Sequence, residues 1–212
     1  MEDAALLTLA ADLARRAGAV ILAVRARGFE TTRKSDASPV TEADHAAEAL
    51  IVQGLRAATP GIPVVAEEEH AAGAVAAEHH EYWLVDPLLG PKPRAWKRTT
   101  AGEHAIRART PPPEGLHVLA SRHSASDPRL QAFLQGRAVA GMVNMGSALK
   151  IVRVAEGAAD LYPRFGRTME WDTAAPHAVL EAAGGQVRAA DGTPLLYGKP
   201  GWENPAFVCT GR

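Results

Sequence analysis

Short apolar strands alternate with amphipathic helices through the second half of the chain, and this alternation limits the fold more than any other feature. The pattern predicts strand Leu116–Ser121, helix Asp127–Gln135, strand Ala138–Val143, helix Ser147–Glu156, helix Thr173–Ala183 ending at Gly184-Gly185, a hairpin around Asp191-Gly192 and a last strand Ala206–Cys209. Strands and helices that alternate in this way pack as layers. The chain is therefore expected to be a layered α/β protein.

The first half carries longer helices. Apolar residues at spacings of three and four predict helices from Ala4 to Arg27, closed by Gly28, and from Thr41 to Ala58. A polar loop, Thr31–Pro39, is expected between them. The remaining predicted elements are three strands: Ile62–Ala66, Tyr82–Val85 and, in a proline-rich stretch, Ala105–Arg109.

Composition narrows the class of protein. With 212 residues and 47% hydrophobic content, the chain can bury a core, and we expect one domain, 1–212, with lobes 1–110 and 111–212. A net charge of -1 gives no basic field for a nucleic acid polymer. The single cysteine, Cys209, excludes an internal disulfide, and no apolar run reaches membrane-spanning length. A cytoplasmic protein without an integral membrane segment is expected.

Carboxylates stand where α/β proteins place their ligand sites. Glu67 and Asp86 each follow a predicted buried strand, and Asp172 opens a predicted helix, whose N–H groups favour a nearby anion. Carboxylate oxygens are the ligands that Mg²⁺ prefers. The three residues are therefore candidate Mg²⁺ ligands.

Structural interpretations of the same residues stay open. Thr41-Glu42-Ala43-Asp44 fits a capping box, Asp172 fits an ordinary N-cap, and Glu67-Glu68-Glu69 fits a solvated acidic turn. The pair His79-His80 has no second pair at ligand spacing, so zinc is not expected.

Four segments, taken in order, carry a family resemblance: Ser38-Pro39-Val40-Thr41-Glu42-Ala43-Asp44, Val64-Val65-Ala66-Glu67-Glu68, Trp83-Leu84-Val85-Asp86-Pro87-Leu88 and Trp171-Asp172-Thr173-Ala174-Ala175. Together they resemble the inositol monophosphatase superfamily, and most of all its 3'(2'),5'-bisphosphate nucleotidase branch (the CysQ type). The resemblance implies an αβαβα sandwich and Mg²⁺-dependent hydrolysis of small phosphate monoesters. Members of the superfamily are monomers or homodimers, so a homodimer is one expectation.

The resemblance also implies residue roles. Glu67, Asp86 and the Leu88 carbonyl would hold one metal, and Asp172 would hold a second metal. Asp44 would help to orient the attacking water and, with Glu67, would be catalytic. Three further residues, in and after the segment Gly146–Lys150, would contact the substrate or its second phosphate: Ser147, Lys150 and Arg164, the last with a surface arginine as its alternative.

One motif departs from the family. Asp-Pro-Leu is normally followed by Asp-Gly-Thr, but this chain has Leu89-Gly90-Pro91 and reaches Ala95-Trp96 within a few residues. An internal deletion that removes part of the first sheet accounts for both features. We therefore expect weak binding of a single Mg²⁺ and a bisphosphate nucleotidase of reduced activity. One alternative is an inactive relic or binding protein that keeps a phosphate pocket. For the substrate, the alternatives are inositol monophosphate and a sugar phosphate such as fructose bisphosphate.

Overall fold

The computed structural model describes residues 3–27, 31–33, 39–73, 82–85, 95–99, 102–121, 126–146 and 149–212. The chain divides into two compact units, residues 1–90 and 91–212, which are treated one at a time below. A single domain with lobes 1–110 and 111–212 stays a prediction. None of the helices within the described ranges has the length and apolar character needed to cross a membrane.

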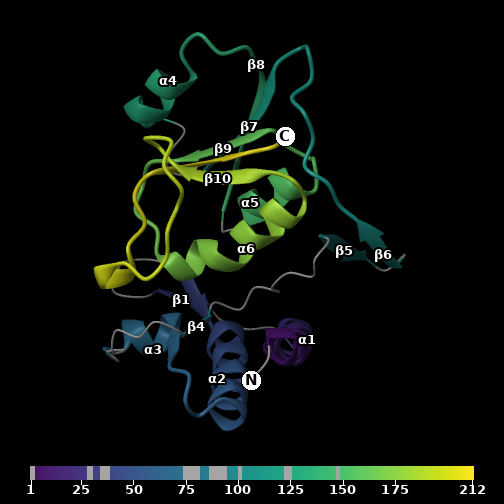
Figure 1. Ribbon diagram of the computed structural model, residues 1–212, viewed down its shortest axis with the longest axis vertical. Helices are drawn as coiled ribbons and strands as arrows, with labels where there is room; N and C mark the ends of the chain where they lie inside the picture. The colour runs from purple at the N-terminus through teal and green to yellow at the C-terminus, as the bar shows by residue number, and fades with distance from the viewer. Residues whose placement is uncertain are drawn as a thin grey trace. The chain divides into compact units, whose positions relative to one another are not determined.

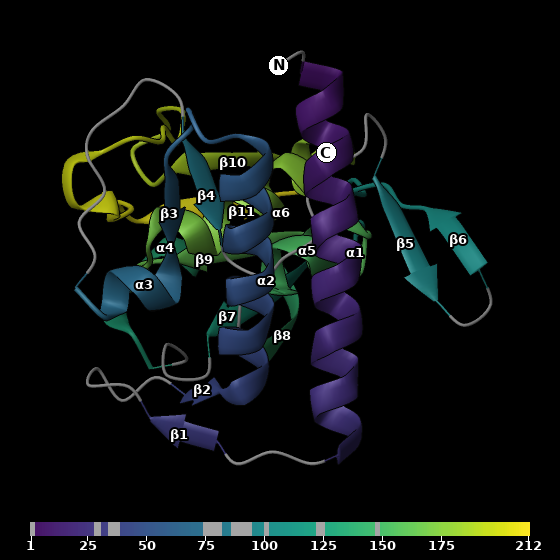
Figure 2. The same cartoon turned by 90° about the horizontal axis from the view of Figure 1, so that it is seen from below.

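The first unit is built on two helices that run side by side, α1 and α2 (Figure 2). Its elements are α1 (Asp3–Arg27), β1 (Thr31–Arg33), β2 (Pro39–Thr41), α2 (Glu42–Ala58), β3 (Val64–Ala66), α3 (Glu67–Ala71) and β4 (Trp83–Val85). Leu13, Val52 and Leu55 of the helices pack with Ala66 and Val85, the last residues of β3 and β4. Because β3 and β4 pair in parallel, these two strands end at the same edge.

The second unit contains, among the described residues, a five-stranded sheet in the order β10-β11-β9-β7-β8. Its elements are β5 (Trp96–Thr99), β6 (Gly102–Ala105), β7 (Leu116–Ser121), α4 (Pro128–Leu134), β8 (Val139–Met145), α5 (Leu149–Ala155), β9 (Leu161–Arg164), α6 (Glu170–Ala182), β10 (Gln186–Ala189), η1 (Pro200–Trp202) and β11 (Phe207–Thr210). Strands β7, β8 and β9 are parallel, while β10 and β11 pair antiparallel.

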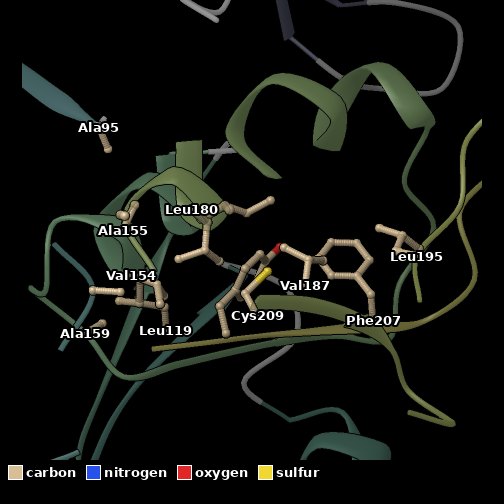
Figure 3. Packing of buried hydrophobic residues seen from close by; sticks show 14 residues of the cluster. Ala95, Leu119, Val154, Ala155, Ala159, Leu180, Val187, Leu195, Phe207 and Cys209 are labelled. Carbon is tan, nitrogen blue, oxygen red and sulfur yellow. The ribbon is translucent and has the colours of Figure 1, made fainter. Parts of the chain in front are cut away.

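Helices α5 and α6 cover one face of this sheet and α4 lies on the other side (Figure 1). The core forms under α5 and α6, where Val154 and Leu180 point toward strand residues such as Phe207 and Cys209 (Figure 3). Cys209 is fully buried and unpaired, and burial is the main reason that the pKa of its thiol is raised. The cysteine is thus a small core residue.

Most elements confirm the sequence prediction, with ends shifted by one or two residues. The expected polar loop Thr31–Pro39 is wrong at both ends, which pair as the antiparallel strands β1 and β2. The expected strand Ala105–Arg109 is also wrong. The preceding residues instead form an antiparallel hairpin of β5 and β6, which ends at Ala105. The backbone of residues 106–109 hydrogen-bonds to Ala95, Ala183 and Arg212. Such bonds to distant segments leave no local periodicity to read.

Asp160, whose carboxylate is buried, joins the start of β9 to three other segments, at Arg109, His117 and Gly211. It accepts hydrogen bonds from Arg109 Nε (2.6 Å) and Nη2 (3.0 Å) and from the His117 N–H (2.7 Å). The Asp160 backbone bonds to His117 O and to the Gly211 N–H. Burial alone would raise the pKa of Asp160, but the Arg109 and His117 hydrogen bonds outweigh burial, so the pKa lies below its ordinary value. Asp160 therefore sets where β9 begins relative to β7 and β11.

We predict that Asp160→Asn lowers the free energy of unfolding at pH 7 by about 2–3 kcal/mol, because the neutral amide cannot satisfy both Arg109 and His117. A carboxyl group with a depressed pKa stabilises the fold above its unfolded-state value and loses this effect as pH falls through the folded-state value. The difference between the variant and the original chain should therefore shrink below about pH 4. Urea unfolding at several pH values measures it. Asp12→Asn, in an exposed ion pair on α1, is the control and should change stability by less than about 0.5 kcal/mol.

Candidate active site

In the first unit, Glu67 is held at the junction of β3 and α3. The strand ends at Ala66 and the helix begins at Glu67, so the N–H groups of the first helical turn have no partner within the helix. Glu48 of α2 supplies one: its carboxylate, on a residue only 3% exposed, accepts from the N–H of Glu68 (2.7 Å) and of Glu69 (3.0 Å). A side chain distant in sequence thus caps α3 and fixes the backbone next to Glu67.

Asp44 belongs to the same acidic group. It lies on the first turn of α2, four residues before Glu48, and residues at this spacing share one face of a helix. His45 Nδ1 lies 3.9 Å from Glu68 Oε2, which brings the first turn of α2 next to the start of α3. The two predicted catalytic residues, Asp44 and Glu67, therefore occur on neighbouring elements.

The acidic surroundings act on Glu48. Burial is the largest cause that raises its pKa, and the charges of Glu68 and Glu69 add to that, against the lowering effect of the two N–H groups. An acid whose folded-state pKa is raised stabilises the fold most at low pH, and this contribution is lost as pH rises through that pKa. The helix-capping bonds are therefore made against an electrostatic penalty that grows toward neutral pH.

In the second unit, the carboxyl ends of the parallel strands gather polar side chains. Strand β7 ends at Ser121, β8 at Met145 and β9 at Arg164, and the carboxyl edge of parallel strands is where α/β proteins bind ligands. Arg164 Nη1 donates to Ser121 Oγ (2.5 Å) and Nη2 donates to the Arg167 carbonyl (2.8 Å). The guanidinium is thereby held in one orientation at this edge.

Lys150 and Tyr162 extend the cluster inward. Lys150 is 3% exposed, and its Nζ donates to the Met145 carbonyl (3.1 Å) and lies 5.0 Å from the Tyr162 ring centroid. Burial raises the pKa of Tyr162 to about 12, while the Ser121 hydroxyl and the Arg164 charge act in the opposite direction. Tyr162 remains a neutral phenol at physiological pH, surrounded by two cations and a hydroxyl.

Asp172 lies on the first turn of α6, at a different position from the one its sequence predicts. The helix begins at Glu170 and its N-cap is Met169, so the predicted start at Thr173 is wrong. The alternative interpretation of Asp172 as the N-cap is wrong as well. Asp172 is the third helical residue, and its Oδ2 accepts from the Met169 N–H (2.7 Å). Its charge acts on Tyr162, which connects Asp172 to the cluster at the strand edge.

The other predicted site residues, Asp86, Leu88 and Ser147, lie outside the described residues, as do Leu89 and Pro91. Glu67 and Asp172 belong to different units, and their convergence stays a prediction. In the part of the chain that the structure describes, no three His, Cys, Asp or Glu side chains form a group able to hold a metal ion.

Sequence reasoning missed three residues of these clusters: Glu48, Ser121 and Tyr162. Ser121 was detectable, because it ends a predicted strand at the edge where ligand sites form. Glu48 gave no signal, because its role depends on the packing of α2 against α3, which no local pattern reports.

The comparisons with known proteins decide the family. The sequence pattern of the inositol monophosphatase family matches residues 2–92 and 97–206. The chain belongs to this family. Its fold agrees: the inositol monophosphatase from Anabaena superposes with a TM-score of 0.67 over 97% of this chain and 90% of that one, at 22% identity.

Two relatives within the family are named as phosphatases of small nucleotides. The chain is 37% identical to the 3'(2'),5'-bisphosphate nucleotidase CysQ of Salmonella typhimurium, over 94% of this chain and 97% of that protein. It is 30% identical to the 3'-phosphoadenosine 5'-phosphate phosphatase of Mycobacterium leprae, over 94% and 87%. The crystal structure of CysQ from Bacteroides thetaiotaomicron matches with a TM-score of 0.65 and 26% identity, over 98% and 97%.

The alignment with the Salmonella protein also shows that the chain is short for its family. It runs over 241 positions, while 94% of 212 residues is about 199, so about 42 positions have no residue of this chain. The family match is itself interrupted between residues 92 and 97. This interruption follows directly on the Leu89-Gly90-Pro91 departure from the family motif.

We predict that Glu48→Ala weakens the β3–α3 junction by about 2 kcal/mol, because two partly buried N–H groups lose their acceptor. Glu48→Gln keeps an acceptor oxygen and should cost less. Hydrogen exchange of the peptide covering residues 62–72 measures the effect directly. Gln53→Ala, on an exposed position of α2, is the control. Equal exchange in the Glu48→Ala and Gln53→Ala variants would contradict the capping role.

Proposed function

We propose that the chain is a Mg²⁺-dependent phosphomonoesterase of the 3'(2'),5'-bisphosphate nucleotidase type, with reduced turnover. The observation that carries the proposal is the 37% identity with CysQ across 94% of the chain. We also place it in the cytoplasm, because the one cysteine is buried and free, which fits a reducing compartment. A homodimer remains part of the proposal.

The proposed metal ligands are Glu67, Asp86, the Leu88 carbonyl and Asp172. Their chemistry fits Mg²⁺, because all are hard oxygen donors. The described ones also stand on fixed backbone: Glu67 at the capped start of α3, and Asp172 with its carboxylate held by the Met169 N–H. Bound Mg²⁺ supplies charge for the phosphoryl oxygens and lowers the pKa of a water molecule. Asp44, beside Glu67, would orient that water for attack on phosphorus.

The proposed substrate contacts are Ser147, Lys150 and Arg164. Two cations, Lys150 and Arg164, flank Tyr162 at the carboxyl edge of the sheet. A substrate with two phosphate groups carries more negative charge than a monophosphate, and one phosphate would bind here while the other is hydrolysed. The paired cations favour the bisphosphate nucleotide over inositol monophosphate as substrate.

The proposed reduction in turnover rests on Leu89 and Pro91. They stand where the family motif has a metal-binding aspartate and a threonine, and the alignment lacks about 42 positions of the Salmonella relative. Leucine offers no side-chain ligand, and proline has neither a hydroxyl nor an N–H. The same observation favours a second candidate function, a phosphate-binding protein that does not turn over.

We predict that Arg164→Met raises KM for 3'-phosphoadenosine 5'-phosphate about tenfold or more, with little effect on KM for a monophosphate substrate, because only the bisphosphate needs the second anion contact. Steady-state kinetics with both substrates measures the difference. Arg167→Met removes a neighbouring exposed arginine and is the control. A similar rise of KM for both substrates would contradict the second-phosphate role.

We predict that purified protein hydrolyses 3'-phosphoadenosine 5'-phosphate about 10²-fold or more slowly than a relative with an intact Asp-Gly-Thr, and that EDTA abolishes the remaining activity. Leu89→Asp alone should restore little, since Pro91 still lacks a hydroxyl. Insertion of the missing segment should restore much more. Asp172→Asn controls for contaminating phosphatase. Family-level turnover by the unaltered chain would contradict the reduced activity, and phosphate binding without any turnover would select the second candidate.

A further inference from the structure

The segment from Tyr197 to Asn204 is tied to the first turns of α6, which carry Asp172. Three side chains make these ties: Glu170 and His177 from the helix, and Asn204 from the segment. His177 Nδ1 lies 2.8 Å from Tyr197 OH. The side chains of Glu170 and Asn204 are each less than 10% exposed. Buried polar groups that are fully hydrogen-bonded hold a backbone in one arrangement.

Glu170 fixes the first part of the segment, at Gly198 and Lys199. It is 0% exposed, and its Oε2 accepts from the Gly198 N–H (2.8 Å) while Oε1 accepts from the Lys199 N–H (2.9 Å). The ammonium group of Lys199 adds an ion pair at 2.5 Å from Oε1. The buried charge of Glu170 is thus neutralised by the segment that it binds, which makes the contact costly to break.

Asn204 fixes the other end of the segment and contacts Met169, the residue whose N–H binds Asp172. Its side-chain Nδ2 donates to the Met169 carbonyl (2.6 Å) and to Thr173 Oγ1 (3.0 Å), and its backbone N–H donates to Thr168 O (2.9 Å). The N–H of the same Met169 donates to Asp172 Oδ2. Asn204 is therefore separated from the Asp172 carboxylate by a single residue, Met169.

Lys199 connects the contacts of Glu170 with those of Asn204. Its Nζ, paired with Glu170, also lies 3.3 Å from Asn204 Oδ1, so the amide of Asn204 has its oxygen on Lys199 and its nitrogen on Met169. The orientation of the Asn204 side chain is thus determined by a charge at one end and a carbonyl at the other. The result is one continuous path: Glu170, Lys199, Asn204, Met169, Asp172.

We propose that Glu170 and Asn204 are positioning residues for the Asp172 carboxylate. They act through the Met169 backbone and touch neither substrate nor metal. The proposal rests on the proposed function in giving Asp172 a metal-binding role. Residues that orient a metal ligand from outside the coordination sphere typically change metal affinity by 10–100-fold when they are replaced. An effect of about tenfold or more on Mg²⁺ affinity is therefore expected.

The test uses Asn204→Asp, which keeps the shape of the side chain and removes its donors. The N–H of Met169 should exchange with solvent at least about tenfold faster, since its contact with Asp172 loosens. NMR hydrogen exchange on the full chain measures this. The matched control is Glu203→Gln, because the Glu203 side chain joins the same two segments through an exposed contact with Arg167 (3.2 Å). The Glu203 backbone, which pairs with Met169, is kept in this variant. Asn204→Ala, which adds no charge, replaces Asn204→Asp if that variant does not fold.

Titration calorimetry with Mg²⁺ supplies the second measurement. The dissociation constant should rise about tenfold or more in Asn204→Asp and stay within about twofold in Glu203→Gln. Unchanged exchange at Met169 overturns the proposal, and so does faster exchange with unchanged Mg²⁺ affinity, which indicates a purely structural contact. Absence of Mg²⁺ binding by the unaltered chain, or Mg²⁺ binding that Asp172→Asn leaves unchanged, refutes the proposed metal-binding role of Asp172 instead. The exchange at Met169 then decides by itself whether Asn204 holds Asp172.

Discussion

The second unit depends on the burial of one charge, Asp160. A buried carboxylate is tolerated only where donors surround it, and here Arg109 and the His117 N–H provide them. The residue immediately after it begins β9, so the same contacts fix the strand that carries Tyr162 and Arg164. The candidate anion site thus takes its geometry from an interaction at the opposite end of the strand.

A similar arrangement recurs at the other carboxylates. Glu48 caps α3 beside Glu67, and Glu170 binds two N–H groups of the segment next to α6. In both cases a buried glutamate binds backbone N–H groups near a candidate metal ligand: Glu67 directly precedes the capped Glu68, and Asp172 lies two positions after Glu170. The buried glutamates thus fix the backbone near the candidate ligands and are not themselves candidate ligands.

The sequence predicted the elements with strong periodicity and missed those fixed by distant partners. Helix α2 and strand β7 have regular apolar spacing and were placed to within one residue. Strand β9 contains Pro163, which argues against a strand, yet β9 pairs with β7 only at Leu161 and needs no further bond on that side. The family motifs predicted Asp44, Glu67, Lys150 and Arg164 as site residues. No motif predicted Glu48 or Asn204, because their partners come from elsewhere in the chain.

The fixed guanidinium of Arg164 has a consequence for ligand affinity. A free arginine side chain carries about 2 kcal/mol of rotamer entropy, and a ligand that orders it must overcome this loss. Here Ser121 Oγ and the Arg167 carbonyl already hold the side chain, so the entropy is lost when the chain folds. The proposed anion affinity at this edge of the sheet would therefore be independent of the chemistry that follows binding, and it would persist even where turnover is impaired.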